Sequence, residues 1–183
     1  MIGPAFAETL AAARDGEEQA FAVLWRDLNP ALLRYLRVLA PAMADDVAAE
    51  VWLEVCRDLR RFRGDEAGFR SWLFTVARMR AVDAARKAAR RPVQPIAPGS
   101  LPDRPAADDP AEAALEAEAT RDALGLIAEL PPDQAEVVAL RVIAGLDVAQ
   151  VGEIVGKRPG TVRVLAHRGL RRLAQRLAER TGV

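Results

Sequence analysis

The stretch from Val148 to Leu165 reads VAQVGEIVGKRPGTVRVL and has the spacing of a helix-turn-helix. Gly156 can end the first helix in a left-handed conformation, which few other residues adopt without strain. Gly152 lies four residues earlier and is small enough to let two helices come close. Pro159 suits the first turn of the second helix, because that position needs no backbone N–H donor. The stretch therefore predicts two helices packed across a tight turn.

The second of these helices extends into a basic stretch, PGTVRVLAHRGLRRLAQRL, which has no acidic residue between positions 159 and 177. Arg163, His167 and Arg168 are predicted to face outward, which is the arrangement that places side chains in a DNA major groove. An ordinary helical hairpin with a solvated basic face is the alternative interpretation. The aliphatic residues of the same helix predict a buried stripe that consists of Val162, Leu165, Leu170, Leu173 and Leu177.

Basic and acidic residues are segregated along the chain, although 26 of each give a formal net charge of zero. Residues 57–91 carry eleven Lys or Arg against four acidic residues, and residues 157–180 carry eight against Glu179 alone. The segment between them, residues 103–118, is acidic. For nucleic-acid binding the distribution of charge matters more than its sum. Both basic segments are therefore candidate DNA-binding surfaces.

The composition argues against a catalytic or metal site. Cys56 is the only cysteine and His167 the only histidine, so we expect no disulfide framework, no metal centre and no cofactor. The carboxylates are not clustered as a metal-dependent enzyme requires, and no GxxxxGK(S/T) phosphate loop occurs, so we expect no enzyme. The sequence has no signal-peptide pattern and no apolar run that approaches about 18 residues, which predicts a cytoplasmic protein without membrane insertion.

The N-terminal block, from about Phe6 to Arg90, has apolar residues at helical spacing. Pro41 interrupts this pattern, and either Asp45 or Asp46 can cap the helix that follows. No alternating strand pattern occurs, so the sequence predicts an all-α fold.

Six prolines lie between residues 92 and 110, in a segment with little apolar content. Such a segment cannot pack a core, and it predicts a flexible, acidic, Pro-rich linker. The expected organisation is therefore two small helical domains, at residues 6–91 and 118–179, joined by a linker at residues 92–117.

Two segments resemble one known family in its expected order. Ala44–Lys87 is similar to region 2 of bacterial RNA polymerase sigma factors, most of all to the extracytoplasmic-function (ECF) branch, and Glu129–Leu173 is similar to region 4. The resemblance implies a non-catalytic subunit that binds core polymerase and directs initiation by reading the −10 and −35 promoter elements. A stand-alone helix-turn-helix regulator is the alternative, but it does not explain the N-terminal block.

For region 2, the resemblance implies a helix that docks on the clamp helices of the largest polymerase subunit. Its pattern is matched by Asp45, Asp46, Val47, Glu50 and Trp52. Helix capping alone is the alternative role of the two aspartates. The turn and helix that follow match the part of the family that captures a flipped −10 base, and the residues assigned to it are Phe62, Arg63, Gly64, Arg78, Met79, Arg86 and Lys87.

Some residues of this segment need a separate interpretation. Met79 stands where the family often has an asparagine, which can hydrogen-bond the flipped base. Phe69 and Trp72 are better explained as core residues than as DNA contacts.

For region 4, the resemblance assigns −35 recognition to Thr161, Arg163, His167, Arg168 and Arg171. Val164, Leu165 and Lys157 depart from the residue types that are usual in the family. The resemblance also implies contact with the polymerase flap, a linker that threads toward the polymerase active centre, and control by an anti-sigma factor. A passive tether is the alternative for the linker. No obligate homo-oligomer is expected.

Overall fold

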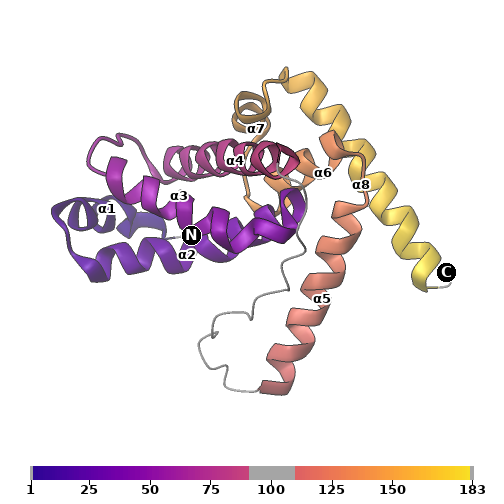
Figure 1. The fold of residues 1–183 in the computed structure, drawn as a ribbon, viewed down its shortest axis with the longest axis horizontal. Helices are drawn as coiled ribbons and strands as arrows, with labels where there is room; N and C mark the ends of the chain where they lie inside the picture. Colours follow the sequence, from indigo (N-terminus) through magenta and orange to yellow (C-terminus); the bar gives the residue numbers. More distant parts are fainter. Residues whose placement is uncertain (1, 91–109, 182–183) are drawn as a thin grey trace.

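The computed structural model describes residues 2–90 and 110–181, and every regular element within them is a helix or a helical turn (Figure 1). The predicted all-α class is confirmed. Most of the predicted linker lies outside the described residues. Helix α5 begins at Pro110, so the last part of the segment expected to be linker is helical.

Residues 2–90, the described part of the N-terminal half, form four α-helices and two short 3₁₀ turns, which are η1 (Gly3–Ala5), α1 (Phe6–Asp15), α2 (Glu18–Leu39), η2 (Pro41–Met43), α3 (Ala44–Asp58) and α4 (Glu66–Arg90). In the C-terminal half, described residues 110–181 form four α-helices and a π-helical turn, which are α5 (Pro110–Ala128), α6 (Pro132–Val138), η3 (Ala139–Ile143), α7 (Val148–Val155) and α8 (Pro159–Thr181).

The N-terminal half is held by helices whose apolar residues repeat every three or four positions. On α2 the buried residues are Leu24, Leu28, Leu32, Tyr35 and Leu36. Tyr35 meets Phe74 of α4 edge-on, with ring centroids 5.3 Å apart. This geometry is favourable for aromatic pairs, and it places two fully buried rings between the helices.

Helix α3 does not use the cap predicted from the sequence. The helix begins at Ala44, its N-cap is Met43, and no side chain caps it. Asp45 and Asp46 lie inside the first turn, where their negative charges interact favourably with the positive end of the helix dipole. The predicted capping role of these aspartates is therefore wrong, and both carboxylates stay exposed.

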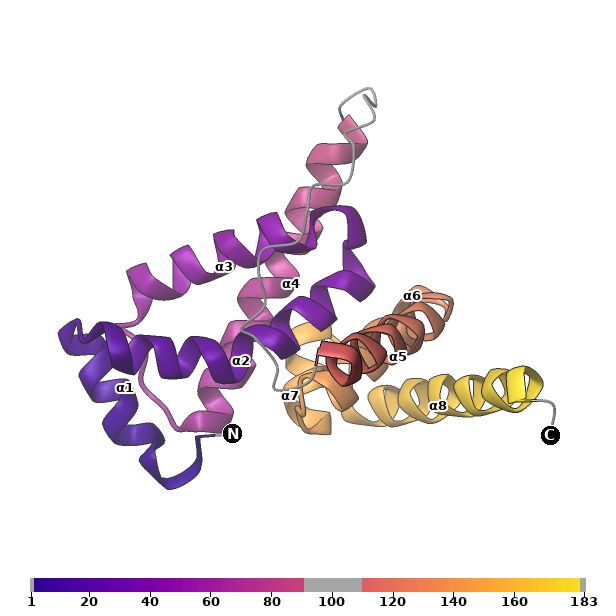
Figure 2. The ribbon, with the colours of Figure 1, turned by 90° about the horizontal axis from the view of Figure 1, so that it is seen from below.

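The two halves of the molecule share one hydrophobic core. A single cluster of buried residues includes Tyr35 and Phe74 from the N-terminal half and Val137 and Leu140 from the C-terminal half. Both views show α7 beside α4 and α8 extending away from the N-terminal helices, while α5 also packs against α2 (Figures 1 and 2). The sequence predicted two tethered domains, but it did not predict that they pack together.

The buried stripe of α8 differs from the predicted one. Val162 is buried and Leu165 and Leu173 are half-buried, but Leu170 and Leu177 are exposed. The reason is Gly169, where α8 crosses α6 so closely that an added Cβ would lie 2.7 Å from Val138 Cγ2. A glycine that sequence reasoning treats as neutral therefore sets which face of the helix is buried.

Candidate nucleic-acid interface

Helix α7 starts and stops as the helix-turn-helix pattern requires. The Asp147 carboxylate accepts hydrogen bonds from the backbone N–H groups of Ala149 (2.7 Å) and Gln150 (2.9 Å), and Gln150 Oε1 accepts one from the Asp147 N–H (2.9 Å). This reciprocal capping box satisfies otherwise unpaired donors at the helix start. At the other end, Gly156 has a φ of 67° and turns the chain toward α8.

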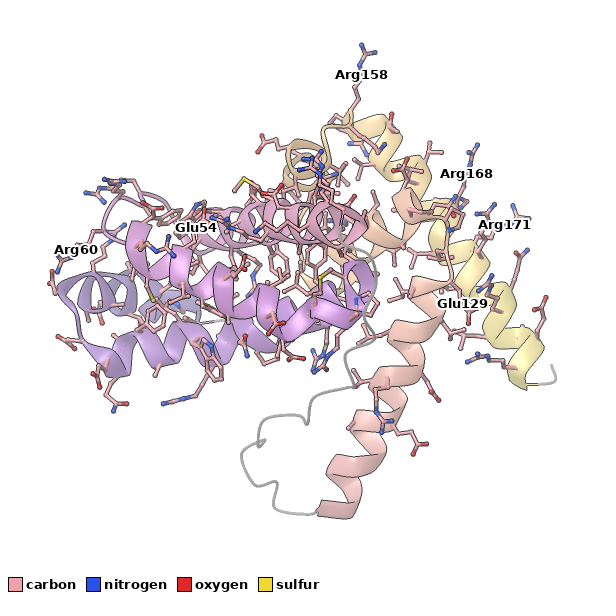
Figure 3. The ribbon with its side chains drawn as sticks, in the orientation of Figure 1. Glu54, Arg60, Glu129, Arg158, Arg168 and Arg171 are labelled. Atoms are coloured by element: carbon pink, nitrogen blue, oxygen red, sulfur yellow. The ribbon has the colours of Figure 1, made fainter. Side chains whose placement is uncertain are left out.

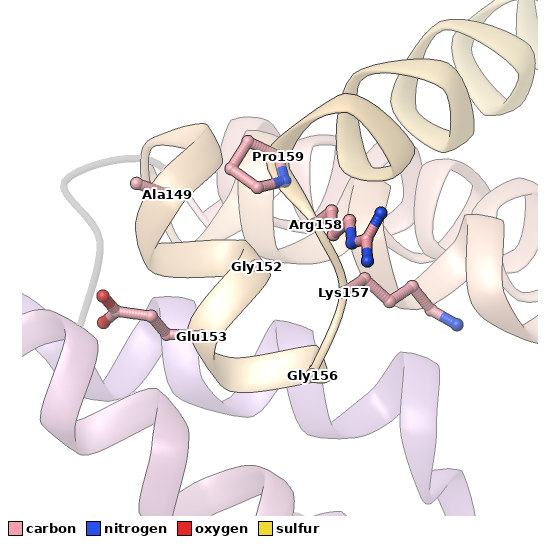
Figure 4. A pocket seen from close by; sticks show the side chains of 7 residues that line it. All are labelled: Ala149, Gly152, Glu153, Gly156, Lys157, Arg158 and Pro159. Atoms are coloured by element: carbon pink, nitrogen blue, oxygen red, sulfur yellow. The ribbon is translucent and has the colours of Figure 1, made fainter.

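The turn is tight because Gly152 has no side chain (Figure 4). An added Cβ at this position would lie 2.7 Å from the Lys157 carbonyl oxygen and 3.8 Å from Val162 Cγ2. Pro159 is the first residue of α8. The predicted helix-turn-helix is confirmed, with Val151, Val155 and Val162 buried between its helices.

The outer face of α8 carries the residues that were assigned to the −35 element, all of them exposed: Thr161, Arg163, His167, Arg168 and Arg171. Arg168 and Arg171 project from the outer side of the molecule (Figure 3). Other cations of the helix are used internally, since Arg172 donates to Gln134 Oε1 (3.1 Å) and Arg176 pairs with Glu129. Arg172 and Arg176 are thus engaged within the domain, whereas the five side chains assigned to the −35 element face solvent.

The turn between α3 and α4 is shaped by Gly64 and Asp65. Gly64 has a φ of 155°, and an added Cβ would lie 2.9 Å from the Phe62 ring, so only glycine fits. Asp65 Oδ1 accepts a hydrogen bond from the Gly68 N–H (2.8 Å) at the start of α4. The Phe62 ring stacks on Trp72, with centroids 5.3 Å apart, and meets Phe69 edge-on. Phe62 thus closes an aromatic cluster, which confirms the core interpretation of Phe69 and fits that of half-buried Trp72.

Two arginines hold the carboxyl end of α3 against this turn. Arg63 Nη1 donates to the carbonyls of Arg60 (2.7 Å) and Phe62 (2.8 Å). Arg14 of α1 donates to the carbonyls of Leu59 (3.3 Å) and Phe62. Cations are favourable at this end of a helix because its carbonyls are unpaired there. Sequence reasoning missed Arg14, since only tertiary structure brings α1 to the turn.

The residues assigned to the −10 element on α4 are not equivalent in the fold. Met79 is 48% exposed, and Arg86 and Lys87 are exposed near the end of the helix. Arg78 instead pairs with Glu136 of α6, with Nε 2.7 Å from Oε1. The hydrogen bond that Arg78 donates to the Glu136 carboxylate raises the pKa of the guanidinium, so this cation stays charged.

The outer face of α3 is acidic with one apolar centre. Asp45, Asp46 and Glu50 are exposed, as a docking surface requires. Trp52 is only 7% exposed and donates from Nε1 to Asn29 Oδ1 (2.9 Å), so it supports the helix from the inside. Its neighbour Leu53 is 57% exposed. Sequence reasoning missed Leu53, although its spacing from Asp46 and Glu50 places it on the same face.

Family models match both halves of the chain. The model described as Sigma-70 region 2 matches residues 24–91, and the model described as Sigma-70, region 4 matches residues 120–173. The ECF RNA polymerase sigma factor ShbA of Streptomyces griseus is 35% identical over 170 residues, which cover 87% of this chain and 88% of that protein. SigD of Mycobacterium tuberculosis is 33% identical over 180 residues, which cover 94% and 84%.

The chain belongs to the ECF RNA polymerase sigma factors. As a sigma factor it binds core RNA polymerase and promoter DNA and directs transcription initiation, and it is not an enzyme. The predicted family and function are confirmed.

Solved structures share the fold of this sigma factor. CnrH, in complex with the cytosolic domain of CnrY, superposes with a TM-score of 0.63 at 22% identity, covering 96% of this chain and 98% of that one. The sigma factor RpoE of Bartonella quintana, in complex with the anti-sigma factor NepR, gives 0.62 at 21% identity, covering 86% and 96%.

Residues 2–90 and 110–181 contain neither a membrane-spanning helix nor a cluster of metal-ligating side chains. None of these helices has the length and apolarity that a membrane span requires. No group of three or more His, Cys, Asp or Glu side chains in the same residues is placed to hold a metal ion.

The seam between the two halves of the sigma factor carries polar contacts around Glu136. Tyr35 donates its hydroxyl to Glu136 Oε1 (3.4 Å), beside the Arg78 pair. Burial, above all, raises the pKa of the Tyr35 hydroxyl well above its usual value, so the hydroxyl keeps its proton. A groove of about 330 Å³ runs along this seam, with Arg78 and Glu136 in its wall.

Proposed function

We propose that the exposed basic face of α8 reads the −35 element and that the α3–α4 turn and α4 read the −10 element. The helix-turn-helix geometry carries the first assignment, because it presents five adjacent polar or basic side chains outward. These five residues are Thr161, Arg163, His167, Arg168 and Arg171. Arginine contributes phosphate contacts for affinity and guanine contacts for specificity.

The −10 surface combines Phe62, Arg63 and Gly64 of the turn with Arg78, Met79, Arg86 and Lys87 of α4. Exposure of Met79 beside a basic track supports this role, because melted DNA needs an apolar surface for its bases and cations for its phosphates. Phe62 contributes by shaping the turn, since its ring packs on Trp72 and Phe69.

Exchanging Met79 for asparagine is expected to change the preferred base at the −10 element. An amide can both donate and accept hydrogen bonds at a base edge, whereas a thioether is only a weak acceptor. A well-formed pair contributes about 1–3 kcal/mol of discrimination, so the preference at one position shifts about tenfold. Sequencing of transcripts from a randomised promoter library measures this shift. An unchanged profile for Met79→Asn would remove Met79 from the −10 reader.

The outer face of α3 is the proposed docking surface for the polymerase clamp helices. Asp45, Asp46 and Glu50 supply its charge and exposed Leu53 its apolar centre, while Trp52 positions the helix from behind. Exposed apolar side chains within a polar rim are typical anchors of protein interfaces.

Leu53→Asp is expected to weaken core-polymerase binding by about tenfold or more, because it places a charge in the desolvated centre of that interface. The free protein should unfold at an unchanged temperature, since the Leu53 side chain is exposed to solvent and contributes little to the core. Titration of fluorescent core polymerase measures the affinity. Ala11→Asp makes the same kind of change on exposed α1 and serves as the control. If the unsubstituted protein, Leu53→Asp and Ala11→Asp bound core polymerase with equal affinity, the docking surface would lie elsewhere.

The remaining assignments complete the proposal. We place the protein in the cytoplasm, with residues 6–91 as the polymerase-binding and −10 domain and 118–179 as the −35 domain. The linker of residues 92–117 joins them, and its last residues, from Pro110, form the start of α5. Control by an anti-sigma factor is part of the proposal, and it is supported by the complex of RpoE, a protein of this fold, with the anti-sigma factor NepR. The proposed reading of the two promoter elements is tested by selecting active sequences from a promoter library with core polymerase and this protein. Two conserved elements should emerge, at −10 and −35.

A further inference from the structure

The N-terminal segment, residues 2–15, ends against the turn between α3 and α4. Arg14, in the last turn of α1, donates from Nε to the Leu59 carbonyl (3.3 Å) and from Nη2 to the Phe62 carbonyl. In return, Arg60 Nε donates to the Arg14 carbonyl (3.2 Å), at the end of the molecule where Figure 3 labels Arg60. Each arginine thus places its charge at the carboxyl end of a helix, Arg14 at that of α3 and Arg60 at that of α1, where unpaired carbonyls favour a cation.

The start of the same segment holds the start of α4. The Glu66 carboxylate accepts hydrogen bonds from the backbone N–H groups of Ile2 and Gly3, both 2.9 Å long. The Phe6 ring is buried, and its centroid lies 5.8 Å from that of the Phe69 ring. The N-terminal segment therefore meets both of the helices that flank the turn.

Two arginines converge on the Phe62 carbonyl. Arg63 Nη1 donates to it (2.8 Å), and Arg14 donates to it from the other helix. Arg63 also donates to the Arg60 carbonyl, so its guanidinium is bent back onto its own turn. When Arg63 extends toward DNA it gives up both carbonyls. Arg14 then keeps the Phe62 carbonyl paired, which avoids the cost of leaving a partly buried acceptor without a donor.

The position of this carbonyl affects the direction of Arg63. The peptide unit is planar, so the unit that carries the Phe62 carbonyl also fixes the plane of the Arg63 N–H. The next residue is Gly64, which has more backbone freedom than any other residue type and gives the turn little stiffness of its own. A donor from outside the turn therefore helps to set the path of the Arg63 side chain.

We propose that the N-terminal segment is part of the −10 reader and that Arg14 is its positioning residue. Arg14 holds the Phe62 carbonyl, which orients Arg63 and lets its guanidinium move to DNA without loosening the turn. The proposal rests on the −10 role assigned above to Phe62, Arg63 and Gly64. The segment lies before residues 24–91, which the region 2 model matches, and its contacts with the turn give it a role in promoter reading.

Transcription by the holoenzyme from a barcoded promoter library tests the proposal. The −10 element is randomised and the −35 element is held constant, so the transcripts report how strongly each −10 position discriminates between bases. Arg14→Ala should lower this discrimination about five- to tenfold, because a charged donor to the turn is lost. Arg14→Lys keeps a charged donor but not the two-pronged guanidinium, and should lower it only about two- to threefold. Affinity for core polymerase should be unchanged in both variants.

Glu66→Gln loosens the other end of the segment by a different contact. Its amide places a donor opposite one of the two backbone N–H groups that the carboxylate binds. It should lower −10 discrimination in the same direction as Arg14→Ala. Arg26→Ala is the matched control, because it removes an exposed arginine from α2, outside the N-terminal segment and the turn. Its profile should equal that of the unsubstituted protein.

A double variant separates positioning from a general loss of structure. If Arg14 acts through Arg63, then Arg14→Ala should have little further effect on −10 discrimination when Arg63→Ala is already present. Residues that act through one shared partner give such non-additive effects, whereas independent ones add.

Three outcomes would overturn the proposal. One is −10 discrimination that Arg14→Ala leaves unchanged. Another is full additivity of Arg14→Ala and Arg63→Ala. The third is a loss of core-polymerase binding by both Arg14→Ala and Arg14→Lys, which would indicate a general loss of structure. Failure of the proposed function is distinguishable, because Arg63→Ala alone would then leave the −10 profile unchanged, and the role of Arg14 would fall with it.

Discussion

Replacing Arg163 and Arg168 together with alanine is expected to abolish transcription from promoters that depend on a −35 element. Both side chains are exposed on the outer face of α8, near its N-terminal end, where a recognition helix meets base edges. Each contact to a guanine edge contributes about 1–3 kcal/mol, so loss of two removes most of the specific affinity. Run-off transcription measures the effect, and binding of core polymerase should be unchanged.

Arg180→Ala is the control for this pair of substitutions. It removes one exposed cation from the same helix, beyond the proposed reading segment. Its transcription should be close to that of the unsubstituted protein. If the double variant also lost polymerase binding, or if Arg180→Ala had an equal effect, α8 would not be the specific reader of the −35 element.

Phe74→Ala is expected to lower the free energy of unfolding by about 3–5 kcal/mol, the range for removal of a large buried aromatic ring. Phe74 is fully buried on α4 and meets Tyr35 edge-on, within the cluster that both halves share. The substitution leaves a cavity that the rigid helices around it cannot fill. Chemical denaturation followed by circular dichroism measures the loss.

The same experiment has a control and a clear contrary result. Val142→Ala removes an exposed aliphatic side chain and should change the free energy of unfolding by less than about 0.5 kcal/mol. A loss for Phe74→Ala as small as that for Val142→Ala would mean that the shared core does not hold the molecule together.

The features predicted well from the sequence are those fixed by neighbouring residues. Gly152, Gly156 and Pro159 specify the helix-turn-helix through a close approach, a left-handed turn and a helix start, and all three lie within eight residues. The exposure of Arg163 and Arg168 follows from the same local geometry. No distant contact was needed to predict either.

The features that were missed depend on residues far apart in the chain. Glu136 lies 58 residues from Arg78 and 101 from Tyr35, so no local spacing predicts their contact. The wrong stripe on α8 has the same origin, because Gly169 acts only through the crossing with α6. Helix periodicity identified the apolar residues, but the partner helix determined which of them became buried.

The most direct test of the account is transcription by core RNA polymerase, supplied with this protein alone, from fragmented genomic DNA, followed by mapping of start sites. The account predicts discrete start sites that share one sequence near −10 and another near −35, and the −35 sequence should disappear with Arg163→Ala/Arg168→Ala. Start sites that share no upstream sequence, or that appear equally without the protein, would contradict it.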